Sequence, residues 1–113
     1  MQIAYFDSQL GAAGDMLLGA TLDAGADLEH IRSTLELLPI EGWHIDAQHV
    51  QRAGFAATKA DVTVTAPQPT RTAREIIEML TTTALPQSVR NQAVSTFELL
   101  GDAEATVHGI DVE

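Results

Sequence analysis

The stretch WHIDAQ at residues 43–48 alternates apolar and polar side chains, and the stretch ADVTVTA at residues 60–66 does the same. Such alternation has the period of a β-strand with one buried face. Between the two stretches, Arg52-Ala53-Gly54 is typical of a hairpin bend. Pro67 and Pro69 then end the pattern. The middle of the chain therefore predicts a β-hairpin, and this hairpin decides the fold class.

Helical patterns lie on both sides of the hairpin. An apolar stripe predicts a helix over residues 13–24, and Asp27 can cap a second helix. After the hairpin, Thr72 and Glu75 form a Thr-x-x-Glu capping box, and Pro86 suits the first turn of a longer last helix. The stripe of the first helix consists of Ala13, Met16, Leu17, Ala20 and Ala24.

A further short extended stretch, Ile3–Phe6, precedes the first helix. Together these elements predict an α+β fold, in which a small sheet of about three strands is covered by about four helices. The expected order is β-α-α-β-β-α-α. A length of 113 residues predicts a single domain over residues 1–113.

The composition excludes several kinds of chemistry. The chain has no cysteine, which excludes disulfides, thiolate nucleophiles and thiolate-bound metals. No apolar run has the length of a membrane span, and no secretion signal follows Met1. We therefore expect a cytoplasmic protein that does not enter membranes. A net charge of −10 argues against nucleic acid as a partner and favours a cationic ligand, a metal ion or a basic surface.

The segment between Asp7 and Asp15 combines several features of a binding site. Gly11 and Gly14 allow a tight turn, and Asp15 lies at the start of the first predicted helix. Neither of the two common phosphate-binding fingerprints is present. The carboxylate of Asp15 also disfavours a bound phosphate at that helix end. A tight turn whose acidic residue stabilises the helix explains the same residues equally well.

Glu104 and His108 are four residues apart on the last predicted helix, so their side chains can point to the same side. Imidazole and carboxylate suit nickel or zinc, but two ligands need a third from elsewhere. A polar helix end is the simpler explanation of this spacing. His30, His44 and His49 are interpreted as structural or solvated residues. No serine has the context of a hydrolase nucleophile.

Several short motifs are spread along the chain, of which GAAGDM (residues 11–16) and EATVHG (residues 104–109) are the most specific. The others are Leu38-Pro39, Gly42-Trp43, Arg52-x-Gly54-Phe55 and Thr58-Lys59-x-x-Val62. Together these motifs resemble the N-terminal part of the LarC family, which consists of nickel insertion proteins, and the resemblance extends over the whole chain.

The resemblance implies a function in making the nickel-pincer cofactor of lactate racemase. Such proteins insert nickel into pyridinium-3,5-bisthiocarboxylic acid mononucleotide. The full-length proteins are CTP-dependent nickel chelatases of the lyase class, and they use Mn²⁺ or Mg²⁺ with CTP in a C-terminal domain that has no counterpart here. Asp7, Gly11, Gly14 and Asp15 would then bind the cofactor precursor, and Glu104 and His108 would bind nickel.

Two positions and one stretch depart from the family pattern. Many members have Cys and Ser where this chain has Ser8 and Leu10, and many have a histidine cluster where this chain has residues 67–72. We therefore expect this chain alone to be inactive and to work with a LarC-like C-terminal domain, in cis or in trans. The alternative is a non-enzymatic interaction module that keeps the fold and forms a homo-oligomer.

Overall fold

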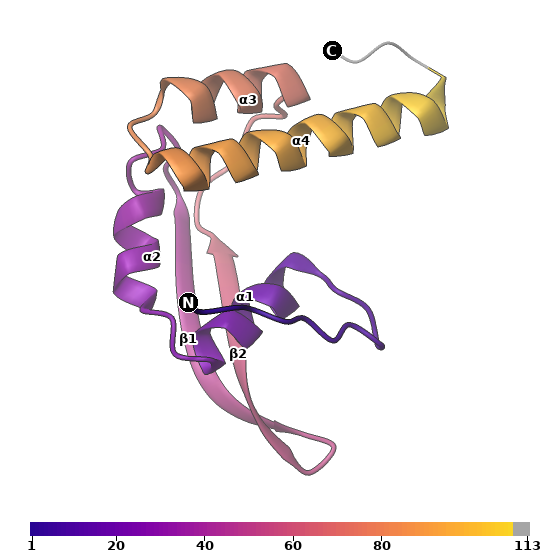
Figure 1. The fold of residues 1–113 in the computed structure, drawn as a ribbon. Helices are drawn as coiled ribbons and strands as arrows, with labels where there is room; N and C mark the ends of the chain where they lie inside the picture. Colours follow the sequence, from indigo (N-terminus) through magenta and orange to yellow (C-terminus); the bar gives the residue numbers. More distant parts are fainter. Residues whose placement is uncertain (110–113) are drawn as a thin grey trace. The chain divides into compact units, whose positions relative to one another are not determined.

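A computed structural model of the chain describes residues 1–109. It contains four helices and one two-stranded sheet within these residues, so the α+β class is confirmed (Figure 1). The elements in chain order are α1 (Gly14–Asp23), α2 (Leu28–Leu35), β1 (Trp43–Arg52), β2 (Phe55–Val64), α3 (Ala73–Thr82) and α4 (Gln87–His108). None of these helices is both long and apolar enough to cross a membrane.

The predicted strand at Ile3–Phe6 is not present. Figure 1 draws this segment as an irregular trace that leads towards α1, and the observed order is α-α-β-β-α-α. A strand needs a neighbouring strand to pair with its backbone groups, and a short run of apolar side chains cannot supply one. Among the described residues, no hydrogen bond of residues 3–6 is found. The sheet therefore has two strands instead of about three.

The predicted hairpin is confirmed, with its bend at Ala53 and Gly54. Both residues have positive φ, 49° and 83°, which is the combination that a tight two-residue hairpin turn requires. Because the strands have equal length on either side of this turn, Trp43 lies opposite Val64. Beyond the strands, the Gly42 carbonyl accepts a hydrogen bond from the Thr65 N–H at 2.8 Å, which continues the same register.

Part of one face of the hairpin, at Thr58 and Ala60, lies against α1. Ile45 and Ala60 on this face are only 4% and 3% exposed. The buried residue of α1 is Gly19, where an added Cβ would lie 2.6 Å from the Thr58 carbonyl oxygen. The Thr58 hydroxyl donates a hydrogen bond to the Asp23 carboxylate at 2.7 Å, which ties the end of α1 to β2. The helix backbone thus lies directly against the backbone of β2.

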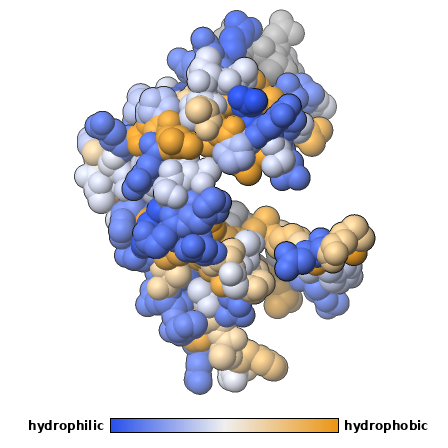
Figure 2. Space-filling model, turned by 60° about the vertical axis from the view of Figure 1, so that its left-hand side comes forward, coloured by the Kyte–Doolittle hydropathy of each residue, from blue (hydrophilic) through white to orange (hydrophobic). Residues whose placement is uncertain are grey.

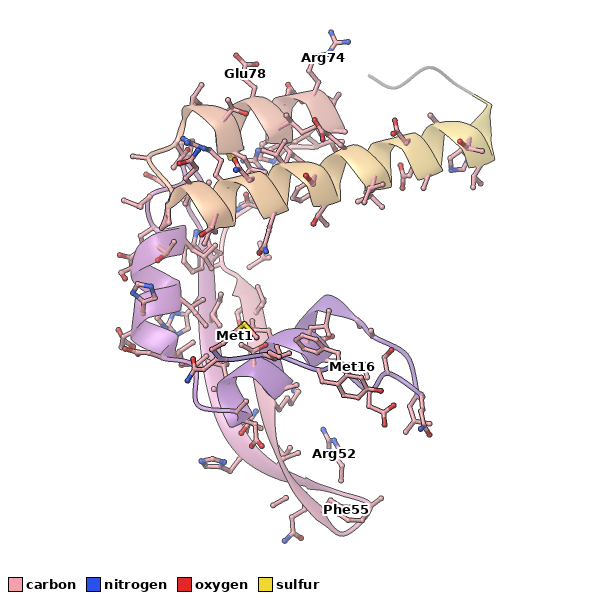
Figure 3. All side chains as sticks on the ribbon, in the orientation of Figure 1. Met1, Met16, Arg52, Phe55, Arg74 and Glu78 are labelled. Atoms are coloured by element: carbon pink, nitrogen blue, oxygen red, sulfur yellow. The ribbon has the colours of Figure 1, made fainter. Side chains whose placement is uncertain are left out.

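In the C-terminal part of the chain, α3 and α4 pack against each other. The predicted capping box is confirmed, since the Thr72 hydroxyl accepts from the Glu75 N–H and the Glu75 carboxylate accepts from the Thr72 N–H. Leu80 and Leu85 are buried here. On the outer face of α3, Arg74 and Glu78 point away from α4 (Figure 3). The remaining helix, α2, has its apolar stripe half-buried.

The chain divides into two compact units. The first contains Met1–Leu28 and Trp43–Thr63, and the second contains Glu29–Gly42 and the chain from Val64 onward. The expectation of a single domain over residues 1–113 stays a prediction.

The capping box predicts a dependence of stability on pH. The hydrogen bonds from the Thr72 N–H and hydroxyl hold the pKa of Glu75 below its ordinary value of 4.5. Because the folded-state pKa is lowered, the carboxylate stabilises the fold above pH 4.5, and this contribution is lost as the pH falls through the folded-state pKa. We expect Thr72→Ala to cost about 1 kcal/mol at neutral pH.

Urea unfolding at pH 6 and at pH 3 would measure this effect. Glu75→Gln should lower stability at pH 6 and should make less difference at pH 3. Glu78→Gln on the outer face of the same helix is the matched control. Equal effects of the two substitutions at pH 6 would show that the cap contributes nothing.

Candidate functional site

The turn between Asp7 and Asp15 is closed by one backbone hydrogen bond. The Gly11 N–H donates to the Ser8 carbonyl at 2.9 Å. Gly11 has a φ of 101°, in the left-handed region that side chains disfavour, so the turn requires glycine at this position. An added Cβ at Gly11 or Gly14 would meet no atom within 4 Å. At these two glycines, no other part of this unit covers the backbone of the turn, so a ligand can approach it there.

At the start of α1, an acidic side chain of the helix itself accepts a hydrogen bond from one of the free backbone N–H groups. Ala13 is the N-cap and makes no side-chain capping bond, whereas the Asp15 carboxylate accepts the Met16 N–H at 2.9 Å. This negative charge in the first turn interacts favourably with the helix dipole. An anionic ligand would compete with it. The carboxylates of Asp7 and Asp15, both on exposed residues, suit a cationic ligand better.

Glu104 and His108 both lie on α4, as predicted, and both are exposed. His108 is the last residue of the helix, and Gly109 caps the helix end with a φ of 63° and an N–H that donates to the Ala105 carbonyl. A cation is favoured at this end of a helix. Within residues 1–109, no three histidine or acidic side chains are grouped so that they could hold a metal. A complete metal site would need ligands from outside this part of the chain.

The two predicted sets of site residues belong to different compact units. Asp7, Gly11, Gly14 and Asp15 are in the first unit, and Glu104 and His108 are in the second. Within each set, the structure places the residues on the elements that the sequence predicted. Their roles in binding stay predictions.

Sequence reasoning missed the polar face of the hairpin as a possible site. There the Asp61 carboxylate accepts from Lys59 and from Gln48, both at 2.6 Å. These bonds, that from Lys59 foremost, hold the pKa of Asp61 below its ordinary value. On β1, the His44 imidazole lies 3.0 Å from the Asp46 carboxylate. The alternation of polar residues along both strands could have indicated this cluster.

The first unit also has a hollow of about 200 Å³. It lies between the C-terminal end of α1 and the hairpin, and none of the predicted site residues lines it. Its lining residues are Leu22, Ala26, Leu28, Ala47, Gln48, His49 and Thr58. His49 points to the opposite face of β1 from His44, as the strand period predicted, so the two cannot bind one metal together.

Comparison with known proteins gives a consistent result. The profile of the family described as "Nickel insertion protein" matches residues 4–113. A protein of Thermomicrobium roseum named for nickel insertion is 41% identical over 114 residues, covering 100% of this chain and 28% of the relative. One of Citrifermentans bemidjiense is 40% identical over 114 residues, covering 100% of this chain and 30% of the relative.

A third relative carries a more specific name. It is a pyridinium-3,5-bisthiocarboxylic acid mononucleotide nickel insertion protein of a Nocardioides species, 39% identical over 109 residues, covering 96% of this chain and 28% of the relative. The chain thus spans less than a third of the length of these relatives. No solved structure matches it.

Proposed function

Because this chain belongs to the nickel insertion protein family, we propose that it is the N-terminal module of a protein that inserts nickel into pyridinium-3,5-bisthiocarboxylic acid mononucleotide. The observation that carries the proposal is the family match over residues 4–113, together with the name of the Nocardioides relative. In this proposal, nickel is the metal delivered and the mononucleotide is the acceptor. The protein works in the cytoplasm and does not bind nucleic acid.

The turn between Asp7 and Asp15 is proposed to bind the mononucleotide. The ring nitrogen of the pyridinium carries a positive charge, which the two exposed carboxylates can attract, whereas the thiocarboxylates and the phosphate of the same molecule are negative and must point away from them. Gly11 and Gly14 leave the backbone of the turn uncovered, so a flat ring can approach it closely. The ring is therefore a better ligand for this turn than a phosphate, for which Asp15 would compete.

Glu104 and His108 are proposed to hold nickel before its transfer. Imidazole is a good ligand for nickel, and thiocarboxylate sulfur is a softer donor than the Glu104 carboxylate. Two exposed ligands at the end of a helix bind a metal weakly, so the metal can leave for the sulfur atoms of the acceptor. A tight, complete site in this chain would oppose that transfer.

The complete reaction is proposed to need a C-terminal part, in cis or in trans. That part would bind CTP with Mn²⁺ or Mg²⁺ and would complete the nickel chelatase, an activity of the lyase class. The chain spans only about 28% of its relatives' length, which supports this division of roles. We expect the chain alone to bind nickel and the mononucleotide without catalysing the insertion of the metal.

A calorimetric titration with Ni²⁺ tests the nickel site. Removing one of two ligands should weaken binding roughly tenfold or more, so His108→Ala should lose most of the heat that the unchanged chain gives. His30→Ala, a histidine substitution on α2, is the matched control and should bind as the unchanged chain does. Equal binding by His108→Ala would contradict the assignment of this residue.

A second candidate function is a non-enzymatic module that forms a homo-oligomer. The exposed apolar side chains favour it, since Tyr5, Leu10, Leu99 and Val107 are all largely exposed. Figure 2 shows apolar side chains at the surface of the molecule among polar ones. In this case neither Ni²⁺ nor the mononucleotide would give heat in the same titration, even with the C-terminal part added.

A further inference from the structure

The first residues of the chain have the character of a strand, but they pair with no strand among residues 1–109. Ile3 and Tyr5 are 80% and 88% exposed, and Ala4 and Phe6 are exposed as well. Among residues 1–109, no hydrogen bond to the backbone of residues 3–6 is found. An extended apolar segment with free backbone groups is a template for pairing with another strand.

Two apolar residues of the same unit are buried, in contrast to this segment. They are Ile45 and Ala60 of the hairpin. The N-terminal segment precedes α1 directly, yet all residues from Met1 to Ala13 are exposed. Apolar side chains along such a segment are buried when a strand is added to a sheet, and the backbone bonds then supply affinity. A partner strand for this segment is therefore not found among the described residues.

We infer that Ile3–Phe6 is a β-strand that pairs with a strand of the C-terminal part found in the longer relatives. All of this chain aligns with the Thermomicrobium relative but covers only 28% of that protein, so most of the relative's chain is available as a partner. A second copy of this chain is a poorer partner, because two chains of net charge −10 repel each other. The pairing would join the module to the rest of the protein.

This inference rests on membership of the family and not on the chemistry of nickel. A chain that binds no nickel can still form this strand, and a nickel-binding chain can lack it. Nickel titration and amide exchange therefore report on the two proposals separately.

Hydrogen exchange measured by mass spectrometry tests the strand. In this chain alone, the amides of residues 3–6 should exchange at close to the rate of an unstructured peptide. In the full-length Thermomicrobium protein, the aligned amides should exchange at least about 100-fold more slowly, because a paired strand must open before its amides exchange. Fast exchange at these amides in the folded full-length protein would overturn the inference.

Substitutions separate strand pairing from a general change at the N-terminus. They are made in a fusion of this chain to the C-terminal part of the Thermomicrobium protein. Ile3→Asp should remove at least tenfold of the protection at residues 3–6, whereas Leu10→Asp, at a position 96% exposed, should not. If the fusion does not fold, exchange in the natural full-length protein decides. Protection in the isolated chain that disappears on dilution would show self-pairing and would also overturn the inference.

Discussion

Replacing Gly42 by alanine should lower the free energy of unfolding by about 3 kcal/mol, because two separate costs combine at this position. Gly42 has a φ of 75°, in the left-handed region, where an L-residue pays a conformational cost. An added Cβ would also lie 2.5 Å from the Cβ of Ala66. That atom is fixed to its backbone, so the chain itself would have to move, and the hydrogen bond between Gly42 and Thr65 would be strained.

Gly54→Ala is the matched control for the first of these costs. Gly54 also has a positive φ, 83°, but an added Cβ there meets no atom within 4 Å. We expect this variant to lose only about 1 kcal/mol. Urea unfolding of both variants measures the difference, which reports the contact with Ala66. If Gly42→Ala and Gly54→Ala lost the same stability, the close packing at Gly42 would not exist in solution.

The second large effect is expected at Gly19, where alanine should cost about 2 kcal/mol. The φ of Gly19 is ordinary, so the cost is steric: the new Cβ would lie 2.6 Å from the Thr58 carbonyl oxygen and 3.4 Å from the Ala60 nitrogen. Alanine has the better helix propensity, which offsets up to about 1 kcal/mol of this cost. The helix must therefore move away from β2 to accept the methyl group.

Gly14→Ala controls for helix propensity in the same helix. An added Cβ at Gly14 meets no atom within 4 Å, so this variant should be neutral or slightly stabilised. Thermal or urea unfolding of the two variants gives the comparison. Two neutral variants would mean that α1 does not pack on β2 as described.

The elements predicted correctly from the sequence depend on local chemistry. The hairpin follows from alternating side chains and a two-residue turn, and the start of α3 follows from the Thr72–Glu75 capping box. Both are set by residues a few positions apart, so the sequence alone could locate them.

The predictions that were wrong depend on contacts between distant residues. Ile3–Phe6 has the side-chain pattern of a strand, but pairing requires a partner elsewhere in a chain. In α1, the apolar stripe correctly predicted a helix, but Met16 and Leu17 of this stripe are exposed and the buried residue is Gly19. A glycine adds little to an apolar pattern, and its value for close packing becomes visible only when β2 lies against it.

The candidate site could be predicted only in part, for the same reason. The spacing of Glu104 and His108 correctly placed both on one helix, and the glycines correctly placed a turn before α1. Which further groups complete a site depends on residues far apart in the sequence. The alternation along β2 places Lys59 and Asp61 on one face, whereas the hydrogen bond from Gln48 to Asp61 depends on the register between the two strands.

The division of the chain into two units restricts how the protein can be cut or exchanged. Residues 29–42 of the second unit interrupt the sequence of the first, so neither unit is one continuous stretch. A single cut in the gene cannot separate them, and recombination cannot transfer one unit intact without the other. Residues 1–63, for example, would carry a fourteen-residue segment whose packing partners had been removed. A protein made from either unit alone must therefore join segments that are separated in the sequence.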